Sequence, residues 1–142
     1  MRALLDVNVL IAMLDQDHSL HRRARDWFGD HAGAGWASCP LTQNGCVRIM
    51  SHSRYPNGVP VATAMRLLRE AAADSRHEFW PDDISLLDAR LIDSTRIHGP
   101  RQLTDIFLLA LALRNGGQFV TFDATVPLAA IVGAKPEALL IL

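Results

Sequence analysis

The chain has 142 residues, of which 49% are hydrophobic and 20% are charged. This size predicts one domain with a buried core, so residues 1–142 are expected to form a single globular unit. The formal net charge of −1 does not indicate a nucleic-acid-binding protein, and no apolar run is long enough to cross a bilayer.

The sequence lacks the signals of a secreted or zinc-binding protein. Asp6 interrupts the apolar N-terminal stretch, so no secretory leader is expected and the cytoplasm is the expected location. Cys39 and Cys46 are seven residues apart, which fits no common zinc spacing, and they are expected to be reduced thiols in or near the core.

The first half of the chain alternates predicted strands and helices. Residues 2–6 predict a buried strand, and Asn8 is expected to cap a short helix over 9–14. The elements expected next are a helix over 19–30, a strand over 35–39, a helix from Pro40 to about 50, a loop over 52–59 and a helix over 60–74.

The second half continues this alternation. The expected elements are a strand over 77–80, a helix from Pro81 to about 97, a helix over 104–115, a strand over 118–122, a helical turn near 126–131 and a strand over 138–142. Strands that alternate with helices predict an α/β fold with a parallel sheet covered on both faces. We expect a three-layer α/β/α sandwich with a central sheet of four or five strands.

Three isolated aspartates are placed to meet at one edge of this sheet. Asp6 follows the first strand, Asp123 follows the strand over 118–122, and Asp105 opens the helix between them. Carboxyl ends of parallel strands lie at one edge, and a helix that feeds such a strand through a tight turn begins at that edge. Clustered carboxylates repel one another, so the pattern predicts a divalent cation such as Mg²⁺.

The alternative for each aspartate is a simple cap at a strand end or a helix start. Helix amino ends stabilise a negative charge by only about 0.3–1 kcal/mol each, which is too little to offset three clustered carboxylates. The topology brings all three to one edge, which favours a metal-dependent site acting on phosphodiesters. Thr42, Gln43 and Asn44 open another helix at this edge.

Four segments resemble the PIN-domain family and, within it, the VapC-type toxins of bacterial toxin–antitoxin pairs. They are Leu4-Leu-Asp6-Val-Asn8, Thr42-Gln-Asn44-Gly-Cys-Val-Arg48, Leu103-Thr-Asp105-Ile-Phe, and Thr121-Phe-Asp123. They occur in the family's order and span most of the chain. The resemblance implies a PIN-like fold, Mg²⁺- or Mn²⁺-dependent ribonuclease activity, and a small VapB-type antitoxin as the partner.

The resemblance also implies roles for individual residues. Asp6, Asp105 and Asp123 would be catalytic and would hold the metal, and Asp123 would orient or deprotonate the attacking water. Asn8 would steady Asp6, and Thr42 matches a hydroxyl that is frequent near the family's site. In-line attack by water would leave a 5′-phosphate and a 3′-hydroxyl.

One departure from the family pattern lies at residues 43–45. The family usually has a glutamate in this segment, whereas the chain has Gln43, Asn44 and Gly45. Asn44 is taken as the substitute in the catalytic set, and an amide brings an oxygen but no charge. Whether the site holds one metal or two is therefore left open.

Substrate and partner surfaces are predicted more coarsely. Arg48 and Arg101 flank the expected site and are candidates for contacts to RNA phosphates, with single-stranded or looped RNA as the expected substrate. A homodimer is expected, and the helices over 9–14 and 60–74 suit either a dimer contact, an antitoxin contact or an ordinary core. The RNA target stays open.

Two other functions compete with the nuclease. A catalytically weak or inactive PIN-fold module that mainly pairs with an antitoxin would explain the missing glutamate. A phosphoacceptor signalling domain would need paired acids after the first strand, but a single Asp6 precedes Val7 and Asn8 there. A metal titration with an RNA-cleavage assay separates the first alternative from the enzyme.

Overall fold

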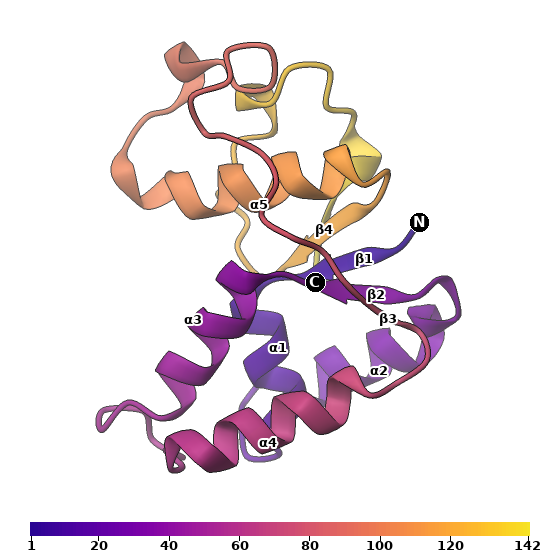
Figure 1. The fold of residues 1–142 in the computed structure, drawn as a ribbon, viewed down its shortest axis with the longest axis vertical. Coiled ribbons are helices and arrows are strands. Elements are labelled where there is room, and N and C mark those ends of the chain that lie inside the picture. The colour runs from indigo at the N-terminus through magenta and orange to yellow at the C-terminus, as the bar shows by residue number, and fades with distance from the viewer.

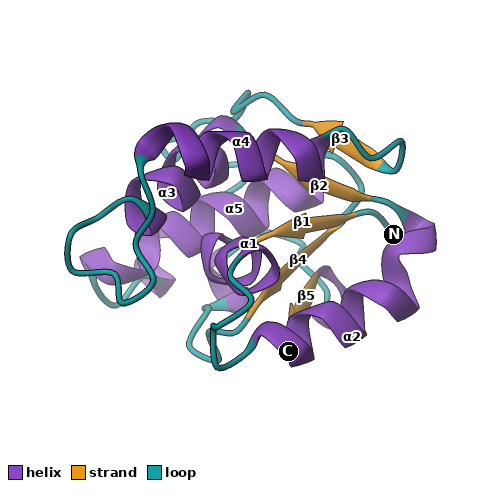
Figure 2. Cartoon of the chain, turned by 90° about the horizontal axis from the view of Figure 1, so that it is seen from below, coloured by secondary structure: helices purple, strands orange, loops and turns teal.

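The computed structural model describes all residues from 1 to 142 and is built on a five-stranded sheet. All neighbouring strands are parallel, in the order β3-β2-β1-β4-β5, which can be followed in Figure 2. The strands are β1 (Ala3–Leu5), β2 (Trp36–Ser38), β3 (His77–Phe79), β4 (Gln118–Thr121) and β5 (Leu139–Ile141). The expected α/β fold with a parallel sheet is confirmed.

Helices cover both faces of this sheet. They are α1 (Val7–Leu14), α2 (His21–His31), α3 (Pro40–Met50), α4 (Val61–Ala72) and α5 (Leu103–Arg114). Figure 1 shows α5 with the C-terminal part of the chain on one side and α1 to α4 on the other. Short 3₁₀ helices are η1 (Ala32–Ala34), η2 (Ser94–Arg96), η3 (Pro100–Gln102), η4 (Leu128–Ala130) and η5 (Pro136–Ala138).

Each face of the sheet carries its own hydrophobic core because side chains alternate along a strand. Leu4 packs with Phe119 and the buried residues of α5 on one face. Ala3 and Leu5 pack on the other face with residues of α1, α3 and α4. Both cysteines are buried and unpaired, in agreement with the sequence expectation.

The turn between α5 and β4 fixes where α5 begins. Gly116 has a φ of 66°, a left-handed conformation that glycine adopts at little cost. A Cβ on Gly117 would lie 2.6 Å from both the Arg2 carbonyl oxygen and the Trp80 ring, so only glycine fits. Because the turn is tight, α5 and β4 run in opposite directions. The first residues of α5 therefore lie at the edge of the sheet where β4 ends.

The helix predicted from Pro81 to about 97 is wrong. The chain there forms turns and the short helix η2, and Ile92 makes an antiparallel bridge with Ile131. Ser85, Asp88 and Asp93 accept hydrogen bonds from backbone N–H groups two residues ahead. These local bonds compete with helical ones, which explains the break in a segment with helix-like apolar spacing.

The predicted cap of the first helix is also corrected. The helix begins at Val7, and its N-cap is Asp6, whose carboxylate accepts a hydrogen bond from the Val7 N–H at 2.7 Å. Asn8 lies inside the first turn and makes other contacts.

No helix in the chain is both long and apolar enough to pass through a membrane.

Candidate functional site

Asp6 lies at the carboxyl end of β1 beside the end of β4. The two strands are hydrogen-bonded neighbours, and the Asp6 N–H donates to the Val120 carbonyl at 2.9 Å. The side chain is only 6% exposed. Burial raises the pKa of Asp6, hydrogen bonds from Thr121 and Val7 partly oppose this, and repulsion from Asp123 adds to the increase.

The hydroxyl of Thr121 connects the elements of this site. It donates to Asp6 Oδ2 at 2.6 Å and accepts from Asn8 Nδ2 at 3.2 Å and from the Asp123 N–H at 3.0 Å. Its one proton and both lone pairs are therefore used. Thr121 was not among the site residues expected from the sequence. Its signal was a hydroxyl at the end of an otherwise buried apolar strand, next to Asp123.

Asn8 holds the end of β4 against α1. In addition to its bond to Thr121, its Oδ1 accepts a hydrogen bond from the Phe122 N–H at 3.3 Å. Asn8 was expected to steady Asp6. It contacts Asp6 through the Thr121 hydroxyl, which it donates to and which donates to Asp6.

Asp105 is the least compensated of the three aspartates. It lies in the first turn of α5 and is partly exposed. Burial, together with repulsion from Asp6 and then from Asp123, raises the pKa of Asp105 to about 6, and no hydrogen bond opposes the shift. The carboxylates of β1, β4 and α5 are thus near enough to interact, as the topology predicted.

Asp123 is held in the turn after β4. Its Oδ1 accepts hydrogen bonds from the N–H of Thr125 at 2.7 Å and from the Thr125 hydroxyl at 2.6 Å. These bonds lower the pKa of Asp123, so it is ionised at neutral pH. Asp123 therefore supplies a fixed negative charge that repels the carboxylate of Asp105.

The donor chemistry of this edge fits a hard divalent cation. Three aspartates supply oxygen ligands, and a cation would relieve the repulsion that acts on Asp105. No group of three or more His, Cys, Asp or Glu side chains is arranged as a ready-made metal site. Mg²⁺ usually keeps several waters and uses only one or two carboxylates directly, so it does not require a ready-made set of three protein ligands.

Thr42 does not offer its hydroxyl to the acidic residues. It is fully buried, and its hydroxyl accepts a hydrogen bond from the Cys39 N–H at 3.0 Å and donates to the Cys39 carbonyl at 3.1 Å. This arrangement closes the first turn of α3. The supporting role of Thr42 is therefore structural, at the start of the helix that carries Asn44.

The three residues at the family's glutamate segment have different environments. A Cβ on Gly45 would lie 2.8 Å from Val7 Cγ2, so no larger side chain fits between α1 and α3 there. Gln43 donates from Nε2 to the Ser38 hydroxyl at 3.0 Å. Asn44 is exposed, and its part in the site stays a prediction.

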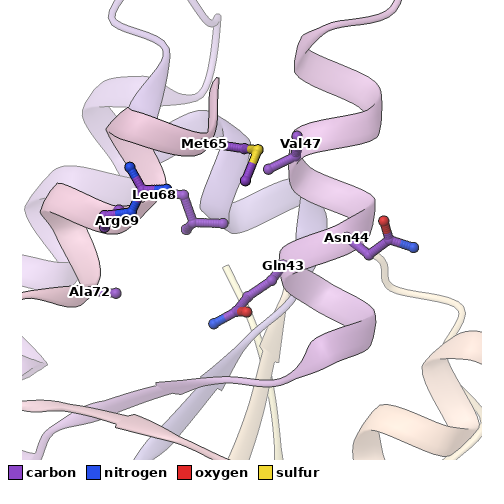
Figure 3. A pocket seen from close by; sticks show the side chains of 7 residues that line it. All are labelled: Gln43, Asn44, Val47, Met65, Leu68, Arg69 and Ala72. Atoms are coloured by element: carbon purple, nitrogen blue, oxygen red, sulfur yellow. The ribbon is translucent and has the colours of Figure 1, made fainter. Parts of the chain in front are cut away.

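A cavity of about 410 Å³ lies beside Asn44, between α3 and α4. Figure 3 shows Gln43 and Met65 directed toward the space between the two helices, whereas Asn44 projects from the other side of α3. The lining residues are Gln43, Asn44, Val47, Met65, Leu68, Arg69 and Ala72. This cavity is mainly apolar and is separate from the three aspartates.

The two arginines expected to contact RNA are both exposed. Arg48 lies in the last turn of α3, and Arg101 lies in η3, four residues before Asp105. Neither forms an ion pair with a carboxylate. Their charges are available to a ligand, and their contact with RNA stays a prediction.

Comparison with known proteins identifies the class to which this fold and site belong. Residues 3–131 match the family model described as the PIN domain. The chain is also 52% identical over 139 residues to Ribonuclease VapC44 of Mycobacterium tuberculosis, with 98% of each chain covered. The chain therefore belongs to the PIN-domain family and, within it, to the VapC family, as the sequence motifs indicated.

Solved structures support the same fold. The structure of VapC20 from Mycobacterium tuberculosis, described as a toxin that cleaves the sarcin–ricin loop, aligns with a TM-score of 0.61 at 13% identity. It covers 94% of this chain and 99% of that one. VapBC2 from Rickettsia felis, bound to a promoter DNA fragment, aligns with a TM-score of 0.53 at 11% identity, over 88% and 90% of the two chains.

Proposed function

We propose that this protein is an endoribonuclease that requires Mg²⁺ or Mn²⁺ and acts as the toxin of a VapBC-type pair. One structural observation carries the proposal. Burial, and then repulsion from Asp6 and Asp123, raise the pKa of Asp105, which supports a shared site for three carboxylates from separate parts of the chain. The ribonuclease name of the relative VapC44 supports RNA as the substrate.

Each side chain has a defined part in this proposal. Asp6 and Asp105 would hold the cation, directly or through water, and Asp123 would orient the attacking water and accept its proton. A bound divalent cation would polarise the scissile phosphate and favour deprotonation of water. Thr121 and Asn8 keep the Asp6 carboxylate in a fixed orientation, as hydrogen-bonded neighbours of metal ligands commonly do. Asn44 supplies an amide oxygen in place of the family's glutamate.

We also propose a VapB-type antitoxin as the partner, and a homodimer as the assembly. The solved VapBC2 structure, whose fold is similar, supports an antitoxin partner. Large apolar side chains on α4 are exposed, with Val61 at 55% and Met65 at 45%. Exposed apolar residues of this kind are typical of surfaces that a partner covers.

Replacement of one aspartate tests the catalytic proposal. Asp6→Asn keeps the size of the side chain but removes a ligand charge, so it is expected to reduce Mn²⁺-dependent RNA cleavage by at least about 100-fold. Cleavage is measured on total RNA, with the new ends mapped for a 5′-phosphate. Asp30→Asn, at an exposed position on α2, is the matched control and should cleave normally.

The alternative is a binding module with little or no activity. The uncharged Asn44 and the absence of a ready-made three-ligand cluster favour it. In that case the wild-type protein would bind the antitoxin but would cleave no RNA at any concentration of Mg²⁺ or Mn²⁺. Full cleavage by a folded Asp6→Asn protein would also contradict the assigned catalytic role.

A further inference from the structure

A second cavity, of about 250 Å³, lies at the C-terminal end of α3, far along the helix from its start. It is formed by the last turn of α3 and the loop that follows, and it is lined by Arg48, Ile49, His52, Arg54, Tyr55 and Pro56. Arg48 and Arg54 are exposed, and neither is paired with a carboxylate. Two uncompensated positive charges therefore line one concave surface.

The loop that shapes this cavity is fixed by a buried carboxylate. Asp15, at the end of α1, is 8% exposed and accepts hydrogen bonds from the Tyr55 hydroxyl and from Asn57 Nδ2, the latter at 3.0 Å. The Val59 N–H donates to the Met50 carbonyl at 3.0 Å and closes the loop against α3. A cavity fixed in this way binds a ligand without the cost of ordering a mobile loop.

The donors around the cavity suit phosphate oxygens. The Arg54 N–H donates to His52 Nδ1 at 3.0 Å, so this nitrogen is an acceptor and the ring proton of neutral His52 is on Nε2. The cavity thus offers two guanidinium groups and one imidazole N–H. Guanidinium groups bind phosphate oxygens in a two-pronged geometry that an ammonium group cannot provide.

The cavity lies on the same helix as Asn44, toward the other end of α3. Asn44, Arg48 and His52 are spaced four residues apart, which places the two helical residues on one face and His52 just beyond the helix end. At about 1.5 Å per residue, Arg48 lies roughly 6 Å along the helix from Asn44. The acidic residues repel phosphates, so an RNA strand needs positive anchors outside that site.

We propose that Arg48, His52 and Arg54 form a phosphate-binding subsite that holds the RNA backbone along α3, away from the acidic residues. The proposal rests on the ribonuclease function and adds to it a path for the substrate. An acidic segment of a protein would also be attracted by these charges. The spacing of Asn44, Arg48 and His52 along α3 favours RNA, because it leads from the cavity toward Asn44, a residue of the proposed catalytic set.

The affinity of RNA for a protein that cannot cleave it tests the subsite. The probe is a fluorescent single-stranded RNA of mixed sequence, roughly 20 nucleotides long so that it can span several phosphate contacts, bound to the Asp6→Asn protein without metal. Adding Arg48→Gln and Arg54→Gln should weaken binding about tenfold and lower the salt slope by about 0.7 for each lost contact. Arg114→Gln, an exposed arginine at the far end of α5, should change neither quantity.

Several results would overturn the subsite. One is that the double arginine variant and Arg114→Gln bind RNA with equal affinity and equal salt slope. Another is that neither of these two proteins binds RNA. Loss of polyglutamate binding with RNA binding intact would assign the cavity to an acidic protein partner instead. Arg54→Gln alone guards against misfolding, because the Arg54 side chain makes no hydrogen bond or ion pair in the protein.

Cleavage of the same RNA by the wild-type protein with Mn²⁺ separates the two proposals. If wild type cleaves the RNA but the arginine variants bind it normally, only the subsite fails. If wild type does not cleave RNA at all, the ribonuclease function itself fails.

Discussion

Asp105 is the residue at which the acidic site most reduces the stability of the folded protein. Its carboxyl is half-buried, has no hydrogen-bond donor and lies near two other carboxylates, so ionisation is unfavourable in the folded protein. Strained functional groups of this kind often reduce stability in exchange for activity. Charge removal at this position should therefore stabilise the metal-free protein.

We predict that Asp105→Asn raises the melting temperature in EDTA at neutral pH, with a gain of about 1 kcal/mol once solvent screening is allowed for. The pKa of about 6 lies above the unfolded value, so ionised Asp105 destabilises the wild type at neutral pH. Asp105 gains a proton as the pH falls below about 6, and the penalty disappears only below the unfolded pKa of about 3.9. The difference in melting temperature should therefore be constant above about pH 7 and shrink between about pH 6 and pH 4.

Calorimetry with and without Mn²⁺ provides the control for this prediction. The cation should raise the melting temperature of the wild type and have little effect on Asp105→Asn. A variant that is less stable than the wild type in EDTA at pH 7.5 would contradict the account of Asp105.

The residue scale also shows why part of the site was predictable. Asp6, Asp105 and Asp123 were placed at one edge by rules of parallel sheets that depend only on element order. Thr121 was not selected, because its importance comes from three hydrogen bonds that form only when α1, β1 and β4 meet. The residues next to Thr121 in the sequence do not indicate those hydrogen bonds.

At the scale of elements, the contact between α1 and α3 links the fold to the site. Val7 follows Asp6 directly and packs on Gly45, so a shift of α1 relative to α3 would move the Asp6 carboxylate. Glycine inside a helix is unfavourable by about 1 kcal/mol relative to alanine, which indicates that close helix packing is what requires it here.

Gly45→Ala is expected to destabilise the protein despite this gain in helix propensity. The added Cβ would lie 2.8 Å from Val7 Cγ2, and overpacking of this kind typically costs about 1–3 kcal/mol. Denaturant unfolding of Gly45→Ala, Val7→Ala and the double variant forms a thermodynamic cycle. The pair should show favourable coupling, since Val7→Ala makes room for the new methyl, and strict additivity would contradict the steric explanation.

The loop anchor at Asp15 is a second element-scale feature with a measurable pH dependence. Burial would raise the pKa of Asp15, but the hydrogen bonds from Tyr55, Asn57 and the Asp17 N–H outweigh it, and the net effect lowers the pKa. The ionised carboxylate therefore stabilises the fold above the unfolded pKa of about 3.9, and this contribution is lost as the pH falls through the folded value.

We predict that Asp15→Asn lowers the unfolding free energy at pH 7 by about 1–3 kcal/mol, the cost of losing hydrogen bonds to a charged group. The difference from wild type should shrink as the pH falls below about 4, where the wild-type carboxylate takes up a proton. Denaturant titrations at several pH values measure this difference. A difference that stays constant down to pH 3 would mean that the charge of Asp15 does not hold the loop.

Element boundaries show where sequence reasoning was limited. The five strands and the helices α1 to α5 fall close to their predicted ranges, since apolar periodicity and glycine or proline signals mark them. The segment after Pro81 failed because its Ser and Asp side chains bond to the nearby backbone and because Ile92 pairs with Ile131. That pairing joins residues far apart in sequence, which a local pattern cannot reveal.

At the scale of the whole molecule, a parallel sheet gathers chemistry from distant parts of the chain. The order β3-β2-β1-β4-β5 places β1 and β4 side by side at the centre, and α5 returns to the same edge. Asp6, Asp105 and Asp123 are therefore brought together by topology, with α3 leading away from them toward the basic cavity. We propose that these three aspartates bind one divalent cation together.

Electron paramagnetic resonance of Mn²⁺ tests this shared site, since it measures the free ion as protein is added. We expect the wild type to bind Mn²⁺ and Asp6→Asn, Asp105→Asn and Asp123→Asn each to weaken binding by about tenfold or more, while Asp30→Asn binds normally. Mn²⁺ binding of wild-type strength by all three site variants, with their folds intact, would contradict it.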